Sequence, residues 1–227
     1  MRARARPRPK PLEPLPETLL ARLAECRDPI KFGRLLWPRS RFYDRQEEIV
    51  RSVYWNTKTV VPAGNKLGKD YVAGFLAVGA FLAPHIFLGT RGDPRCQEVR
   101  VVTTSVRDDH LDVLWGEIGR YIATSAVPLL REKGGPLVQI HHEVTKYVHG
   151  HYCEISYLKG ITSKKGEGMA GHHANHTLFI ADEASGIDDQ AYEQADGWAK
   201  RHLIIGNPNP CNNAFYRYVR EGDLLAR

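Results

Sequence analysis

The feature that most constrains the fold is a short β-branched run that turns through glycines into an apolar segment of helical length. Residues 59–62 supply the run, residues 63–68 supply the turn, and Lys69 opens the apolar segment. Backbone N–H groups of such a turn can surround phosphate oxygens, and the positive end of the following helix strengthens the field around them. The lysine can reach the β- and γ-phosphate oxygens as a point charge. The stretch therefore predicts a strand, a phosphate-binding P-loop and a helix over 69–82.

Two positions depart from the usual P-loop pattern, G-x-x-x-x-G-K-[S/T]. Ala63 stands where the first glycine is usual, and Asp70 stands where a Ser or Thr hydroxyl would bind Mg²⁺. Because carboxylate oxygen is also a good ligand for Mg²⁺, we expect Asp70 to ligate the metal; the alternative is that Asp70 caps the helix and faces away. The predicted phosphate-binding residues are Ala63, Gly64, Asn65, Lys66, Leu67, Gly68, Lys69 and Asp70.

Composition limits the classes of protein to which the chain can belong. Apolar residues make up 42% and charged residues 26%, as in an ordinary globular protein, and no run approaches the ~18 apolar residues of a membrane span. Five of the six net positive charges come from the first ten residues, and residues 1–16 are rich in proline. We predict a flexible basic tail over 1–16 and a single domain over 17–227.

Strand and helix patterns alternate along the rest of the chain. Buried-strand patterns over 98–105, 177–182 and 202–207 each end in polar residues, and helices are expected over 108–122 and 188–198. Such alternation predicts an α/β fold with a mostly parallel central sheet flanked by helices, whose ligand crevice lies at the carboxyl ends of the strands.

The residues at these strand ends have the chemistry that ATP hydrolysis requires. Asp182 closes an apolar strand where a Walker B aspartate holds Mg²⁺, and Glu183 follows it, positioned to orient or deprotonate the attacking water. Asn207, at the end of another strand, can contact the γ-phosphate or that water. With Lys69 in the phosphate-binding turn, these residues predict a Mg²⁺-dependent ATPase that uses Asp182 and Asp70 as metal ligands.

Two further candidate sites have weaker patterns. Tyr43 is followed three residues later by Gln46, just before the P-loop, and an aromatic ring and an amide can stack on and hydrogen-bond to adenine. The alternative is an ordinary helix start with Asp44 as its N-cap. Lys164 and Lys165 lie in a polar, Gly-rich stretch over 159–176 that we predict to be a mobile loop; they are either a trans-acting finger for a neighbouring subunit or solvated surface residues.

Taken in order, these motifs resemble the ATPase domain of the large terminase of tailed bacteriophages. The matching stretches are Gln46, the P-loop, Thr103-Thr104-Ser105, residues 171–174, residues 178–186 and residues 205–208. The resemblance implies a P-loop NTPase of the additional-strand type. It also implies that Gln46 binds adenine, that Lys69 binds phosphate, that Glu183 is catalytic, and that the coupling motif is Gly206-Asn207-Pro208.

The same resemblance implies a biological setting. It implies a DNA-packaging motor that forms a ring on the portal protein, works with a small terminase subunit and drives double-stranded viral DNA into the prohead. Such a motor acts in the host cell cytoplasm, and the chain is expected to form a homo-oligomeric ring when assembled and to be a monomer in isolation. Large terminases usually continue into a nuclease domain, but about 19 residues follow Pro208, so we expect no nuclease activity from this chain.

Two other functions remain open. A nucleotide-binding scaffold that does not hydrolyse ATP would account for Ala63 and Asp70, although it has no need of Glu183. A helicase-like remodelling ATPase is the other alternative, although the sequence has only one recognisable ATPase core.

Overall fold

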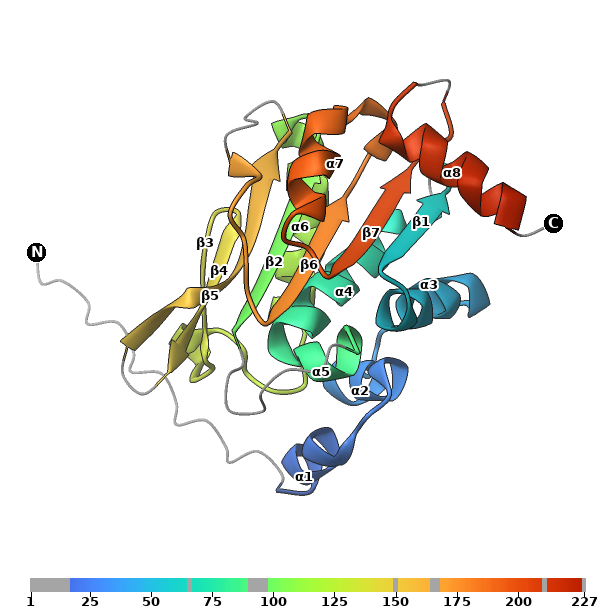
Figure 1. The fold of residues 1–227 in the computed structure, drawn as a ribbon. Coiled ribbons are helices and arrows are strands. Elements are labelled where there is room, and N and C mark those ends of the chain that lie inside the picture. Colours follow the sequence, from blue (N-terminus) through green and yellow to red (C-terminus); the bar gives the residue numbers. More distant parts are fainter. Residues whose placement is uncertain are drawn as a thin grey trace, which may run out of the picture.

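A seven-stranded sheet forms the centre of the molecule, in the order β1-β7-β6-β2-β5-β4-β3 (Figure 1). The computed structural model describes residues 17–64, 67–89, 98–148, 151–163, 168–209 and 212–225. Five neighbouring strands from β1 to β5 are parallel, and β3, β4 and β5 pair antiparallel along one edge. The strands are β1 (Lys58–Pro62), β2 (Val99–Ser105), β3 (Leu137–Ile140), β4 (Glu143–Val148), β5 (His151–Thr162), β6 (His176–Ala181) and β7 (Arg201–Gly206).

Helices cover both faces of the sheet, so the predicted mostly parallel α/β fold is confirmed. One hydrophobic core joins a face of the sheet to the helices near the N-terminus and to α4 and α6, and a second core joins the other face to α7 and α8. The helices are α1 (Glu17–Glu25), α2 (Pro29–Leu36), α3 (Asp44–Trp55), α4 (Lys69–Leu82), α5 (Pro84–Phe87), α6 (Asp108–Ala123), α7 (Asp189–Asp196) and α8 (Ala214–Leu225).

The position of β7 defines the topology at the centre of the sheet. β7 follows β6 in sequence but lies between β1 and β6, paired in parallel with both. The strand that leads into the P-loop and the strand that ends before Asp182 are therefore not adjacent. This is the additional strand that the sequence resemblance implies.

The helix that follows the P-loop, α4, begins and ends where the sequence predicts. Its residues from Val72 to Phe81 are all buried, because α4 packs on the sheet and is covered in turn by other helices. Phe75 is the centre of this packing: its ring lies 4.7 Å from Phe42, 5.3 Å from Trp37 and 5.8 Å from Tyr121, measured between ring centroids. The helix that carries Lys69 is thus anchored in the larger core.

Two local predictions are wrong. Asp44 is the first helical residue of α3 and Tyr43 is the N-cap, because the Tyr43 backbone is extended while its carbonyl accepts the first helical hydrogen bond, from the Glu47 N–H (3.2 Å). The stretch predicted as a loop over 159–176 begins as a strand, since β5 continues to Thr162 in parallel pairing with β2.

Several predicted features lie outside the described residues, namely the tail over 1–16, Asn65, Lys66, Lys164 and Lys165. In the part of the chain that is described, no helix has the length and apolar character needed to cross a membrane.

Candidate active site

The carboxyl ends of the central strands lie side by side at one edge of the sheet. The N–H of Ala63, just after β1, donates to the carbonyl of Gly206, the last residue of β7 (2.9 Å). The N–H of Asp182, just after β6, donates to the carbonyl of Thr104 in β2 (2.9 Å). The P-loop, Asp182 and the end of β7 therefore meet at one edge, as parallel pairing requires.

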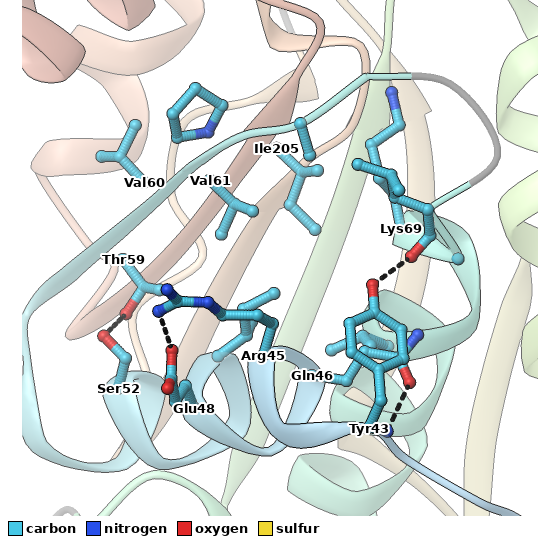
Figure 2. Close-up of a pocket in the computed structure, with 16 residues that line it drawn as sticks. Tyr43, Arg45, Gln46, Glu48, Ser52, Thr59, Val60, Val61, Lys69 and Ile205 are labelled. Carbon is cyan, nitrogen blue, oxygen red and sulfur yellow. Dashed lines mark hydrogen bonds and ion pairs between the residues drawn. The ribbon is translucent and has the colours of Figure 1, made fainter.

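A cavity of about 520 Å³ opens beside the P-loop, between α3, β1 and the start of α4 (Figure 2). Its volume lies in the range of small-molecule sites. Tyr43 and Gln46 line it together with Lys69, so the structure brings the candidate adenine-binding pair and the candidate phosphate-binding lysine to one pocket. Other lining residues are Arg45, Glu48, Ile49, Ser52, Thr59, Val60, Val61, Pro62, Ala63, Leu67, Gly68, Val72 and Ile205.

The P-loop is held against α3 at this cavity. The Tyr43 hydroxyl donates to the Leu67 carbonyl (2.8 Å). Gly68 has a left-handed backbone (φ 69°), and a Cβ atom there would lie 2.7 Å from Gln46 Nε2. A side chain at position 68 would thus be strained and would displace Gln46, which is buried. Gly68 and Gln46 fix the distance between the loop and the candidate base-binding wall.

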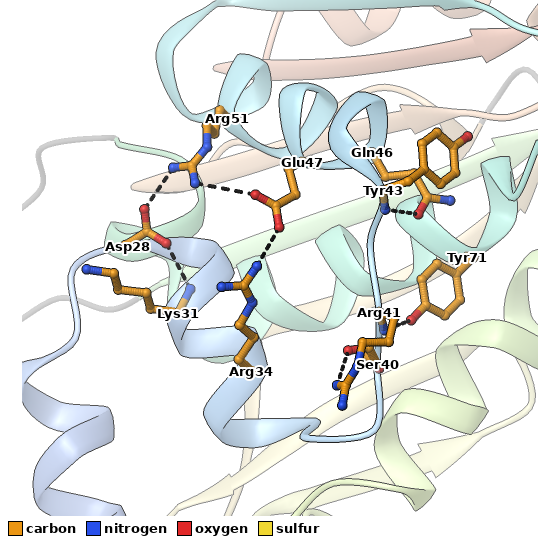
Figure 3. A network of polar contacts seen from close by, with 10 residues as sticks. All are labelled: Asp28, Lys31, Arg34, Ser40, Arg41, Tyr43, Gln46, Glu47, Arg51 and Tyr71. Carbon is orange, nitrogen blue, oxygen red and sulfur yellow. Dashed lines mark hydrogen bonds and ion pairs between the residues drawn. The ribbon is translucent and has the colours of Figure 1, made fainter.

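Ion pairs hold α3 against α2 (Figure 3). Arg51 lies 2.8 Å from Asp28, at the start of α2, and 3.6 Å from Glu47. Arg34 lies 2.7 Å from Glu47. Each such exposed pair contributes little alone, but Glu47 and Arg51 are each shared by two pairs, which join α2 and α3 into one network. This network fixes the helix that presents Tyr43 and Gln46 to the cavity.

Lys69 and Glu183 form the central ion pair of the site, with 3.1 Å between Nζ and Oε1. The Lys69 side chain is only 7% exposed, so its charge is largely removed from water. Glu183 has a left-handed backbone (φ 50°, ψ 46°), which is uncommon for a residue with a side chain. Such conformations persist only where surrounding contacts hold them, and they cluster at functional sites.

Asp182 lies beside this ion pair and is almost fully buried. Burial, followed by the neighbouring carboxylates of Asp70 and Glu183, raises the pKa of Asp182 to about 7. Burial also raises the pKa of Asp70. The Lys69 ammonium lowers this pKa in part, and the carboxylates of Glu183 and Glu117 raise it further. The first turn of α4 thus places the Asp70 carboxylate near Asp182.

The carboxylates of Asp182 and Asp70 fit a divalent cation whose remaining ligands come from elsewhere. Asp182 Oδ1 is buried and has no hydrogen-bond partner among the described residues, so a cation there would satisfy it. Those residues contain no group of three or more His, Cys, Asp or Glu arranged to hold a metal by themselves. Mg²⁺ is usually held by one or two carboxylates together with substrate phosphates and waters, so the donor set is suitable.

Asn207 and Pro208 follow Gly206 directly, at the end of the central strand β7. A Cβ atom at Gly206 would lie 3.0 Å from the backbone nitrogen of Ala184, so glycine permits β7 to approach the turn that carries Glu183. Asn207 is partly buried. The candidate coupling motif therefore begins between the P-loop and the Glu183 turn.

Sequence reasoning missed three charged residues near the site. Arg45 and Glu48 line the cavity and pair at 2.6 Å. Glu117 on α6 raises the pKa of Asp70, and Gly74 lets α6 approach α4 closely. Spacing on α3 could have indicated the first pair. No local signal indicates Glu117, because its place depends on helix packing.

Comparison with known proteins points to one class of phage protein. No protein-family model matches the chain. A curated protein from Enterobacteria phage P7, described as a probable terminase large subunit, is 27% identical over 179 residues. The match covers 76% of this chain and 33% of the phage P7 protein, so the chain spans about a third of that relative's length.

Solved structures of large terminases share the fold. Two structures of the ATPase domain of the Thermus phage P74-26 large terminase, one of them a mutant, superpose with TM-scores of 0.60 and 0.58 at 20% and 21% identity, covering 83% of this chain and 72% of theirs. The HK97 bacteriophage large terminase has a TM-score of 0.58 at 12% identity, over 84% of this chain and 39% of its own. The predicted mostly parallel α/β fold and the resemblance to phage large terminases are confirmed.

Proposed function

We propose that this chain is the ATPase part of a DNA-packaging motor, which hydrolyses ATP to drive double-stranded viral DNA into a prohead. The observation that carries this proposal is the meeting of Lys69, Asp182 and Glu183 beside a nucleotide-sized cavity. The additional strand β7 lies between the strands that lead to them. The similarity to a probable terminase large subunit supports the same function.

In this proposal each side chain has a defined task. The adenine lies in the cavity against Tyr43 and Gln46. The backbone of the P-loop and the Lys69 side chain bind the phosphates. Asp182 and Asp70 would hold Mg²⁺, which supplies neutralisation of charge on the phosphate oxygens. Glu183 orients and deprotonates the attacking water, and Asn207 contacts the γ-phosphate or that water.

The Lys69–Glu183 ion pair makes the activation of water depend on ATP binding in the proposed site. While Lys69 contacts Glu183 at 3.1 Å, each charge is compensated by the other. A γ-phosphate competes with Glu183 for the ammonium, because phosphate carries more negative charge and more acceptor oxygens. Binding of ATP therefore releases the Glu183 carboxylate to act on water only when the substrate is in place.

The proposed partners are double-stranded DNA, a portal protein and a small terminase subunit, with copies of the chain arranged in a ring in the host cell cytoplasm. Lys164 and Lys165 are the candidate trans-acting residues, and Gly206-Asn207-Pro208 is the candidate coupling motif. The closeness of Gly206 to the Ala184 backbone supports coupling between β7 and the turn that carries Glu183.

Phosphate release measured with and without duplex DNA tests the proposal. We expect ATP hydrolysis that requires Mg²⁺ and that duplex DNA, portal protein or small terminase subunit stimulates. ATP binding without hydrolysis under all these conditions would instead identify a nucleotide-binding scaffold. Separation of DNA strands by the chain would identify a helicase-like remodelling ATPase.

Substitutions of Asp70 test its proposed role as a metal ligand. Asp70→Ala should weaken the affinity for ATP in the presence of Mg²⁺ by about tenfold or more, whereas Asp70→Thr should retain much of it, because a hydroxyl replaces the carboxylate oxygen. ATP affinity should be measured over a range of Mg²⁺ concentrations for wild type and for the Ala, Thr and Asn variants. Indistinguishable Mg²⁺ dependence in all four proteins would show that Asp70 does not ligate the metal.

A further inference from the structure

The turn that follows Glu183 is held by a residue far away in the sequence. Ala184–Gly186 form a short 3₁₀ turn directly after Glu183. The side-chain amide of Asn213 donates toward three carbonyl oxygens of this region, those of Ala184 (3.0 Å), Ser185 (3.2 Å) and Ile187 (2.9 Å). The amide has only two N–H groups for these three acceptors. Its nitrogen therefore lies among the three carbonyl oxygens, which surround it from one side of the turn.

Few other contacts fix the same turn in the described part of the chain. The Gly186 N–H donates to the Glu183 carbonyl (3.0 Å), and the buried Tyr192 hydroxyl donates to the Ala184 carbonyl (2.8 Å). Because the left-handed backbone of Glu183 is not favoured by the residue itself, such contacts decide whether its side chain faces Lys69. Asn213 supplies the largest number of hydrogen bonds to this turn.

Asn213 immediately precedes α8, which other contacts hold to α7 and to the sheet. Asp189, the first residue of α7, accepts from the Ala214 N–H (2.6 Å) and pairs with Arg217 (2.8 Å). On the next turn of α8, the Tyr218 hydroxyl accepts from Lys58 in β1 (3.1 Å). The position of the Asn213 amide is therefore set by the docking of α8.

We infer that Asn213 is a positioning residue that links the seating of α8 to the orientation of the catalytic carboxylate of Glu183. The inference rests on the proposed ATPase function. If α8 moves away from the sheet, the three hydrogen bonds are lost and the Glu183 turn can relax to a common backbone conformation. The carboxylate then no longer faces the Lys69 ammonium. Asn213 and α8 follow the candidate coupling motif in the chain. A displacement of α8 would therefore be transmitted through Asn213 to the Glu183 carboxylate.

Two substitutions separate this role from simple capping of α8. The Asn213 Oδ1 atom accepts from the Tyr216 N–H (3.3 Å), and serine or aspartate at that position keeps such an acceptor while removing the amide donors. Asn213→Ser should lower kcat about tenfold with the ATP dissociation constant within about twofold of wild type. Asn213→Asp should lower kcat further, because its carboxylate faces three carbonyl oxygens.

Hydrogen exchange gives a readout that does not depend on activity. Amide exchange at residues 184–187 should become faster in Asn213→Ser, while exchange in α4 stays unchanged. Glu221→Gln is the matched control, because Glu221 is exposed on α8, beyond the contacts with Asp189 and Lys58 that seat the helix, and its substitution leaves the turn intact. It should keep wild-type kcat and wild-type exchange at 184–187.

The outcomes separate the inference from the proposed function. Wild-type exchange at 184–187 in both Asn213 variants would overturn the inference, whether or not the chain hydrolyses ATP. Faster exchange with unchanged kcat would also overturn it, because Asn213 would then have only a structural role. Absence of ATP hydrolysis by the wild-type chain with its partners would overturn the proposed function instead. If Asn213→Asp does not fold, Asn213→Ser provides the same comparison.

Discussion

Replacing Glu183 with glutamine is expected to lower kcat for ATP hydrolysis by about 10²–10⁴-fold, the usual contribution of a general base. Glutamine has nearly the same size and keeps the contacts of the turn, but it cannot accept the proton of the attacking water. It also removes the charge that pairs with Lys69 at 3.1 Å. ATP binding should therefore be unchanged or tighter, because Lys69 no longer has to leave a carboxylate to reach the phosphates.

Single-turnover hydrolysis and ATP binding should be measured on Glu183→Gln together with Glu193→Gln. Glu193 is an exposed glutamate on α7, outside the candidate site, so its substitution should leave both quantities unchanged. Hydrolysis by Glu183→Gln at a rate near that of wild type would show that the catalytic base is another residue.

Truncation of Phe75 to alanine is expected to lower the free energy of unfolding by about 3–5 kcal/mol, as for other buried phenylalanines. Phe75 is fully buried, and its ring contacts aromatic rings from α5, from α6, from the C-cap of α2 and from the loop before α3. Alanine leaves a cavity that these rigid rings cannot fill without moving the helices to which they belong. The loss should appear in denaturant unfolding as a lower midpoint.

Val113→Ala is the matched control for this stability prediction. Val113 is on α6, the helix that packs beside α4, but its side chain is 57% exposed. Its truncation should change the free energy of unfolding by less than about 0.5 kcal/mol. A Phe75→Ala protein that is as stable as Val113→Ala would show that the aromatic cluster is not a major part of the core.

Much of the site could be predicted from sequence because its residues follow strands with strong patterns. The apolar runs before Asp182 and Asn207 are buried central strands, and in parallel strands their carboxyl ends must meet at one edge. The sequence predicts both ends of the helix from Lys69, because its apolar run is continuous and Pro84 lies just after its end. The roles of these residues in catalysis remain predictions.

The features that sequence reasoning missed depend on contacts between distant segments. The left-handed backbone of Glu183 is stabilised by Tyr192 and Asn213, and neither contact has a local signal. The first residues predicted as a loop, at the end of β5, are a strand because β2 supplies a pairing partner. The N-cap of α3 is Tyr43 because its carbonyl accepts the first helical hydrogen bond from Glu47, although Asp44 is the residue type that caps helices more often.

The place of β7 in the sheet has a consequence for the width of the site. Neighbouring strands lie about 4.8 Å apart, so with β7 between them β1 and β6 are separated by about 10 Å. β7 is thus a fixed spacer between the phosphate-binding half and the water-activating half, and backbone hydrogen bonds rather than side chains set its thickness. The Lys69 side chain spans the gap to Glu183, and a shift of β7 changes the distance between the two halves.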